Sequence, residues 1–296
     1  MDTNTKLIYL KATRKDMAGL NRELNKIPVE KITKYLSEAM FIAITSSITA
    51  AEFQETIEVL LKYGADINYI HNNSTVLLTT LATKMWPAAE WIIIRKADLS
   101  LKDNLNRNCL HIIIENFPKD IKPLKLMAKL IDLGANPLDE DINGNTPLHR
   151  ACEKLWVDAI QVLINTKGTV MHKNSITLDT PLHVVARQRG SEAIECAKRL
   201  LNAGALVKAL NKQQKTPLDD AITKGNAEMK EQLEKKMIEE YYIEQQSLNM
   251  CYGYSQAQPI GYEGMPEQLY SIMYQSMPDA FGYNQVPYQR KFIYKC

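Results

Sequence analysis

Apolar side chains recur along this chain at the spacing of an α-helix. Leu148, Ala151 and Cys152 lie three and four residues apart, which places them on one helical face. A second apolar run follows at 159–164, and the polar segment 139–145, rich in turn-forming residues, precedes the pair. The pattern predicts pairs of short helices joined by polar turns.

The same pattern returns at regular intervals. Thr-Pro-Leu-His occurs at 146–149 and 180–183, and Thr-Pro-Leu-Asp follows at 216–219, with spacings of 34 and 36 residues. Two degenerate copies lie upstream at 108–111 and 75–78, with further spacings of 38 and 33. A Gly-Ala landmark, or a weaker form of it, precedes each motif by 11 or 12 residues. Two landmarks in phase over five units indicate tandem repeats.

The motif and its period resemble the ankyrin repeat, a unit of about 33 residues with a Thr-Pro-Leu-His signature. The resemblance covers roughly residues 5 to 245. It implies an all-α solenoid of helix-turn-helix units with hairpin-like fingers, about seven units including degenerate caps. We therefore expect a solenoid domain at 1–246.

The residues of the motif explain why a helix begins there. Thr accepts a backbone N–H bond at the helix N-terminus, and Pro fits the first helical position because its missing N–H would have no helical partner. Gly168 and Gly204 are expected to end second helices, since glycine adopts the left-handed conformation without a Cβ clash. Leu178 stands where Gly144 stands in the preceding repeat, so these two turns are expected to differ.

The segment 247–296 differs in composition from the repeats. It is rich in Tyr, Gln and Met and poor in charges and branched aliphatic residues, so it is expected to be largely disordered or docked. A short helix at 266–277 is predicted as its contact motif. The centre of this motif is predicted to be Leu269, Tyr270, Met273 and Tyr274.

Composition narrows the class of partner. The 36 Lys and Arg residues nearly balance the 34 Asp and Glu residues, so charge favours neither nucleic acid nor an anionic membrane surface. The five cysteines form no C-x-x-C pair and are expected to be reduced thiols. The sequence shows no signal-peptide pattern and no apolar run that could span a bilayer. A cytoplasmic monomer is expected.

Candidate chemistry is scarce. By the ankyrin resemblance, His111, His149 and His183 have a structural role that links adjacent repeats. The other histidines, His71 and His172, have no Cys or His beside them at metal-ligand spacing. Neighbouring carboxylates are typical of solvated surface, and no G-x-G-x-x-G, G-x-x-x-x-G-K-[ST] or G-x-S-x-G motif occurs. We predict no catalytic residue, metal ligand or cofactor.

The resemblance places partner contacts on the fingers and on the solvent-facing side of the first helices. The partner-binding residues predicted on this basis are Tyr69, His71, Asn72, Lys102, Asp103, Asn104, Glu140, Asp141, Arg150, Lys154 and Gln188. Further positions of the same kind are Asn174, Asn211, Thr79, Thr83, Ile112, Asn116, Val184 and Lys224. Trp156 is added as a surface candidate because aromatic residues are enriched at binding hot spots; the alternative is a core position.

The predicted function is a non-catalytic scaffold that binds a partner protein through the concave ankyrin face. The use of Ile, Lys and Asn is typical of a low-GC genome and makes a secreted bacterial effector, acting in the cytoplasm of a host cell, one candidate. A viral or eukaryotic adaptor fits the repeats equally well. The alternative is an enzyme or enzyme-targeting adaptor with an unrecognised site in the tail.

Overall fold

The computed structural model describes residues 3–46, 49–116, 119 and 121–251. Throughout this part of the chain, every regular element is an α-helix. The helices, in chain order, are α1 (Thr3–Thr13), α2 (Met17–Leu24), α3 (Val29–Thr45), α4 (Ala50–Lys62), α5 (Val76–Ala82), α6 (Trp86–Ile94), α7 (Cys109–Asn116), α8 (Ile121–Asp132), α9 (Pro147–Glu153), α10 (Val157–Ile164), α11 (Pro181–Ala186), α12 (Ser191–Asn202), α13 (Pro217–Thr223) and α14 (Ala227–Cys251).

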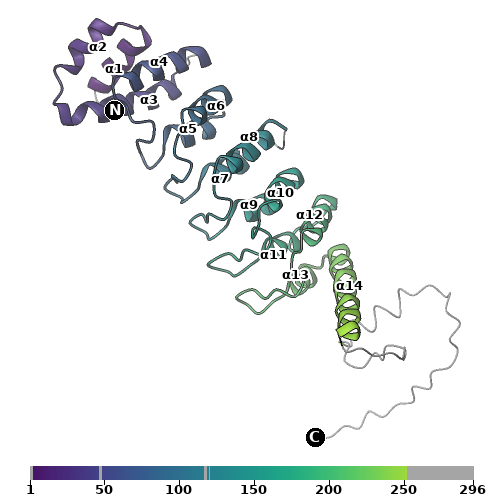
Figure 1. Ribbon diagram of the computed structural model, residues 1–296. Coiled ribbons are helices and arrows are strands. Elements are labelled where there is room, and N and C mark those ends of the chain that lie inside the picture. Colours follow the sequence, from purple (N-terminus) through teal and green to yellow (C-terminus); the bar gives the residue numbers. More distant parts are fainter. Residues whose placement is uncertain (1–2, 47–48, 117–118, 120, 252–296) are drawn as a thin grey trace, which may run out of the picture. The chain divides into compact units, whose positions relative to one another are not determined.

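From α5 onward the helices form consecutive pairs. The first helices α5, α7, α9, α11 and α13 pack one against the next, and the second helices α8, α10 and α12 do the same. The hairpin-like fingers project on one side of this row, and the second helices lie on the other side (Figure 1). This arrangement confirms the predicted all-α ankyrin solenoid.

The first helices begin as the motif predicts. Thr75, Thr146 and Thr216 are N-caps whose hydroxyl groups accept a backbone N–H bond from the third residue of the helix. Pro occupies the start of α9, α11 and α13, where its missing N–H leaves no bond unmade. Each cap of this kind contributes about 1 kcal/mol to helix stability.

The leucine of the motif is a core residue in successive repeats. Leu148 and Leu182 are fully buried, and so is Leu110, while Leu77 is 2% exposed. Small residues such as Ala151 pack beside them, which lets neighbouring helices approach closely. Burying one leucine contributes about 1.5–3 kcal/mol, and the four units that contain Leu77, Leu110, Leu148 and Leu182 each have this contribution.

The finger turns that contain Gly144 and Leu178 are the two that were expected to differ. Leu178 has φ 57° and Gly144 has φ 73°, so both adopt the left-handed conformation, as Asn106 and Gln214 do. The two turns therefore do not differ in backbone conformation at this position. They differ in length, because the closing bond of the later turn joins Asn174 N to the carbonyl oxygen of Asp179, one residue more than in the fingers that begin at residues 103, 141 and 211. The expectation that the two turns differ is therefore confirmed.

The chain divides into two compact units, residues 1–230 and 231–296. This division falls inside α14, and so does the predicted solenoid boundary at residue 246. The predicted contact motif in the tail lies outside the described residues.

Candidate functional site

The fingers are held in shape by their first side chain. Asp103 accepts the backbone N–H groups of Leu105 and Arg107, each at 2.9 Å. Asp141 accepts those of Asn143 and Asn145 at 2.8 and 3.0 Å. Asn174 and Asn211 make equivalent bonds in the next two fingers. These bonds satisfy backbone donors that the turn would otherwise leave unpaired.

Histidines tie each first helix to the next finger. The Nε2 atoms of His111, His149 and His183 lie 2.9, 3.0 and 3.0 Å from the carbonyl oxygens of Asn145, Asp179 and Lys215, respectively. A carbonyl oxygen only accepts, so each Nε2 carries the proton.

The other ring nitrogen is also engaged. Nδ1 of His149 and of His183 lies 2.8 Å from the hydroxyl group of the capping threonine, Thr146 or Thr180. Burial lowers the pKa of His149 to about 4, so its ring is neutral at pH 7. Neither nitrogen is left for proton transfer or metal binding, which agrees with the structural role that the resemblance implies.

An ion network follows the inner side of the repeats. We use this name for three arginines and six carboxylates of the fingers and first helices. They are Arg107, Arg150, Arg187, Asp103, Glu115, Asp141, Glu153, Asp179 and Asp220. Within this network, carboxylates outnumber guanidinium groups two to one, so the network itself carries an excess of negative charge.

The pairs in this network are close. Arg150 donates to Asp141 at 2.6 Å and to Glu153 at 2.9 Å. Arg187 donates to Asp179 at 2.6 Å and contacts Asp220 at 2.7 Å. Burial raises the pKa of Asp179, but the bonds from Arg187 and Asn211 outweigh it and leave that pKa below its usual value.

One part of the network has the composition of a metal site. Ligand atoms of Asp179, His183 and Asp220 all lie within 4.8 Å of one another. Arg187 already bridges the two carboxylates, and both ring nitrogens of His183 are hydrogen bonded. The donor atoms are therefore engaged within the protein, and this cluster is best described as an ion network.

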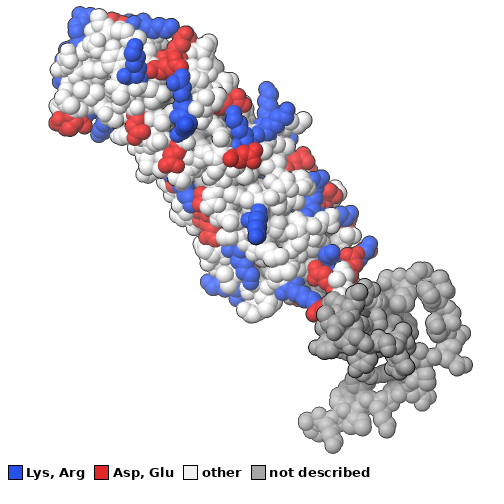
Figure 2. Space-filling view, viewed as in Figure 1, with Lys and Arg blue, Asp and Glu red and all other residues white. Residues whose placement is uncertain are grey.

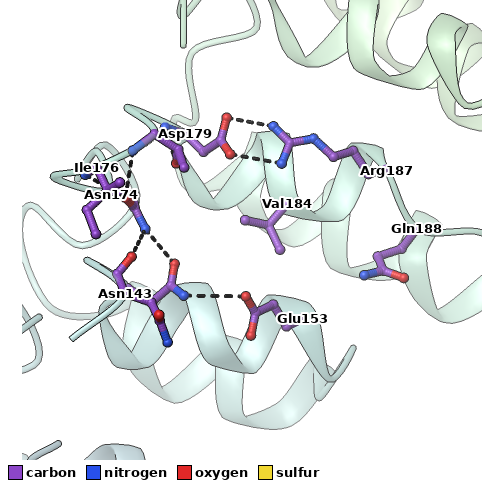
Figure 3. Close-up of a pocket in the computed structure, with 10 residues that line it drawn as sticks. Asn143, Glu153, Asn174, Ile176, Asp179, Val184, Arg187 and Gln188 are labelled. Atoms are coloured by element: carbon purple, nitrogen blue, oxygen red, sulfur yellow. Dashed lines mark hydrogen bonds and ion pairs between the residues drawn. The ribbon is translucent and has the colours of Figure 1, made fainter. Parts of the chain in front are cut away.

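A pocket of about 450 Å³ opens between two fingers and their first helices, α9 and α11. Its lining consists of Asn143, Asn145, Glu153, Asn174, Ile176, Thr177, Asp179, Val184, Arg187 and Gln188. Val184 lies between the Asp179–Arg187 pair on one wall and Glu153 on the other (Figure 3). The pocket thus combines charged walls with an aliphatic centre.

Comparison with known families gives one match in this region. The family model described as "Ankyrin repeat" matches residues 177–212, which contain α11, α12 and the end of a finger. Residues 177–212 of the chain form an ankyrin repeat.

Similar proteins share this repeat. Transient receptor potential cation channel subfamily A member 1 of Homo sapiens is 28% identical over 190 residues, 62% of this chain and 16% of that protein. Ankyrin repeat and SOCS box protein 16 of Homo sapiens is 36% identical over 99 residues, 32% of this chain and 20% of that protein. NF-kappa-B inhibitor alpha of Sus scrofa is 36% identical over 81 residues, 27% of this chain and 24% of that protein. The chain thus spans less than a quarter of the length of each.

Several predicted contact residues of the ankyrin fingers lie inside the fold. Asp141, Asn174 and Asn211 are 4, 3 and 2% exposed, and the side chain of Asp103 is 6% exposed. Their expected position at the partner-facing surface is wrong, because their side chains turn back to accept backbone N–H groups. The resemblance assigns the fingers as a whole to the contact surface, whereas turns of this kind need some of their Asp and Asn side chains for their own backbone.

Trp156 is also buried, with 2% of its surface exposed, so its expected surface position is wrong. It is the N-cap of α10 at the helix connection. Within the described residues its indole N–H has no hydrogen-bond partner. Ile112 on α7 is 2% exposed and belongs to the core as well.

The remaining predicted contact residues reach the surface. Asn72, Asn104 and Lys154 are exposed. The partly exposed ones are Tyr69, His71, Lys102, Glu140, Arg150 and Gln188. Several of these are bonded within the protein: Lys102 to Asp139 at 3.0 Å, and Glu140 to Nε2 of His172 at 2.8 Å.

Of the residues that line the pocket, Asn174, Val184 and Gln188 are predicted contact residues, and no sequence pattern pointed to the others. Glu153 and Arg187 occupy the same position of their first helices, and only three-dimensional packing shows that they face one pocket. On the face seen in Figure 2, acidic and basic side chains alternate with uncharged surface. No helix in the described part of the chain is both long and apolar enough to cross a membrane.

The cysteines Cys109, Cys152 and Cys196 are buried free thiols. Burial raises the pKa of Cys109 to about 12 and that of Cys196 to about 11. A thiol with so high a pKa is a poor nucleophile at neutral pH. These three cysteines are therefore packing residues.

Proposed function

We propose that this ankyrin-repeat chain is a non-catalytic scaffold that binds a partner protein through its fingers and first helices. Ankyrin repeats are protein–protein interaction modules. The observation that carries the proposal is the inner side itself, where rigid fingers border a pocket whose walls are charged and whose centre is aliphatic.

The finger tips add apolar contact area to this surface. Ile70, Leu105, Ile142 and Ile176 come from successive fingers and are 40–59% exposed. Neighbouring fingers are also bonded through their backbones, as by the N–H of Ile142 and the carbonyl oxygen of Leu105 at 2.9 Å. Exposed aliphatic side chains on a rigid backbone lose little conformational entropy when a partner covers them.

The histidine geometry supports a non-catalytic role, because the repeat histidines use both ring nitrogens within the fold. One similar protein is named an inhibitor of NF-kappa-B, which is an action on another protein. A host-cell effector role, a cytoplasmic location and a monomeric state stay predictions from the sequence.

Site-specific photo-crosslinking tests the proposal. A benzoylphenylalanine placed at Gln188 or Asn104 should crosslink a protein from cell lysate, whereas the same residue at Glu195 on α12 should not. Gln188 lines the pocket, and Glu195 is an exposed residue of a second helix. Crosslinks confined to Glu195 would contradict the proposal, and so would turnover of a small molecule by the purified chain.

A further inference from the structure

The pocket between α9 and α11 has one carboxylate with spare bonding capacity. Oε2 of Glu153 accepts from Arg150 at 2.9 Å, while Oε1 has only a long contact of 3.5 Å with Nδ2 of Asn145. The Glu153 side chain is 37% exposed. An ionised carboxylate can accept about four hydrogen bonds, so Glu153 can take a further donor from solvent or from a ligand.

Arg187, on the opposite wall of the pocket, is not available to bind an anion. The Arg187 guanidinium donates through Nε to Asp220 at 2.8 Å and through its terminal nitrogens to both oxygens of Asp179. Two carboxylates thus surround one guanidinium group. A partner carboxylate that approached Arg187 would meet these two negative charges.

The charge around the pocket is therefore negative. The lining residues and their direct ion-pair partners comprise three carboxylates, Glu153, Asp179 and Asp220, and the two guanidinium groups of Arg150 and Arg187. The buried histidines beside them are neutral at pH 7 because burial lowers their pKa, and so do not offset this excess. The ammonium group of nearby Lys154 donates to the carbonyl oxygen of Glu115 in the preceding repeat, at 2.6 Å.

The centre of the pocket is aliphatic. Val184 and Ile176 contribute branched side chains, and Ile176 is 51% exposed at the rim. Long cationic side chains place their methylene stems on such surface while the charged end reaches a polar group. In Figure 3, Val184 separates the paired wall from Glu153, so a stem lying on Val184 would bring its charged end to the free side of Glu153.

We propose that this pocket receives an arginine or lysine side chain from a basic segment of the partner protein, with its stem on Val184 and Ile176 and its charge at Glu153. This proposal rests on the proposed function, since it names the chemistry of the partner at the same surface. The pocket would bind the charged side chain of the partner's basic segment, whereas the apolar finger tips would contact aliphatic residues of the same segment.

Methyl NMR of the full chain tests the pocket directly, with N-acetylarginine amide as the probe and N-acetylcitrulline amide as its uncharged counterpart. The arginine probe should shift the Ile176 and Val184 methyl signals in a saturable way. The citrulline probe should bind at least about threefold more weakly, which is the range of a partly exposed ion pair. N-Acetylglutamate amide should produce no saturable shift.

Variants assign the effect to Glu153. Glu153→Gln should reduce binding of the arginine probe to the level of the citrulline probe. Val184→Lys should abolish binding, because the introduced lysine places a cation in the pocket itself. The control Glu195→Gln on α12 should leave binding unchanged. Equal binding of arginine and citrulline, undiminished binding to Glu153→Gln, or stronger binding of the glutamate probe would overturn the proposal. If one of these results is found while crosslinks still form at Gln188, the proposed occupant of the pocket is wrong and the proposed function stands. Crosslinks confined to Glu195 would instead contradict the proposed function itself.

Discussion

The repeats between residues 103 and 216 differ from the earlier repeats in what links one unit to the next. In the later repeats, His149 and His183 bond to carbonyl oxygens of the next finger. Arg150 bonds to Asp141 of its own finger, and Arg187 bonds to Asp220 of the next repeat. In the earlier repeat, Leu78 stands at the histidine position and is buried, and its finger closes through a two-residue turn between His71 and Ser74. Both kinds of repeat keep a capping threonine and a buried leucine. The difference shows that units can stack without the histidine and arginine links, which shape the inner side of the later repeats.

The largest predicted loss of stability comes from the buried motif leucine, which both groups of repeats contain. Leu182→Ala and Leu77→Ala should each lower the free energy of unfolding by about 2–5 kcal/mol, because each leaves a cavity among packed helices. Urea unfolding followed by circular dichroism measures both. Markedly different losses at the two positions would show that the regions do not share one mode of packing.

The histidine links make the later repeats sensitive to acid. The pKa of His149 is lowered from 6.5 to about 4, so the unfolded state binds a proton more readily than the folded state. Stability is therefore fully present above pH 6.5 and is lost as the pH falls towards 4, by about 3 kcal/mol for this group alone. Urea unfolding across this pH range measures the loss.

His149→Leu, which copies Leu78, should flatten this part of the pH profile although it removes a bond at pH 7. An unchanged slope in the variant would mean that another group carries the pH dependence.

The arginine links should have an intermediate effect. Arg150→Ala removes the charged partner of Asp141, whose side chain is only 1% exposed, and should cost about 1–3 kcal/mol. Lys154→Ala, at the neighbouring exposed position, should cost less than about 0.5 kcal/mol. Thermal unfolding of the two variants side by side checks this. Equal costs would indicate that the ion network does not stabilise the inner side.

The smallest effect concerns the finger turns. Leu178→Asn should stabilise the chain by up to about 1 kcal/mol, because asparagine tolerates the φ of 57° better than leucine. Gly144→Ala should have the opposite sign, since a Cβ there would lie 2.7 Å from Oδ1 of Asn174 in the next finger. Melting temperatures of both variants give the signs, and a destabilising Leu178→Asn would show that the leucine side chain makes a contact worth more than its backbone strain.

The sequence predicted the fold well because the repeat motif combines a cap, a proline and a core leucine in one phase. It predicted the binding surface less well. The ankyrin resemblance predicts Asp141 and Asn174 at the contact surface, yet their side chains close the turns. Trp156 was misplaced because burial at a helix connection depends on neighbours from other repeats. The pocket joins residues from two repeats, and no local pattern brings Glu153 and Arg187 together.

Hydrogen–deuterium exchange on the complex with a captured partner would locate the partner on the repeats. A partner bound to the inner side should slow exchange in the fingers at 103–107, 141–145 and 174–179 and in α9 and α11, with no change in α10 and α12. Slower exchange in α10 and α12 with unchanged fingers would place the partner on the opposite side of the repeats and contradict the proposed binding surface.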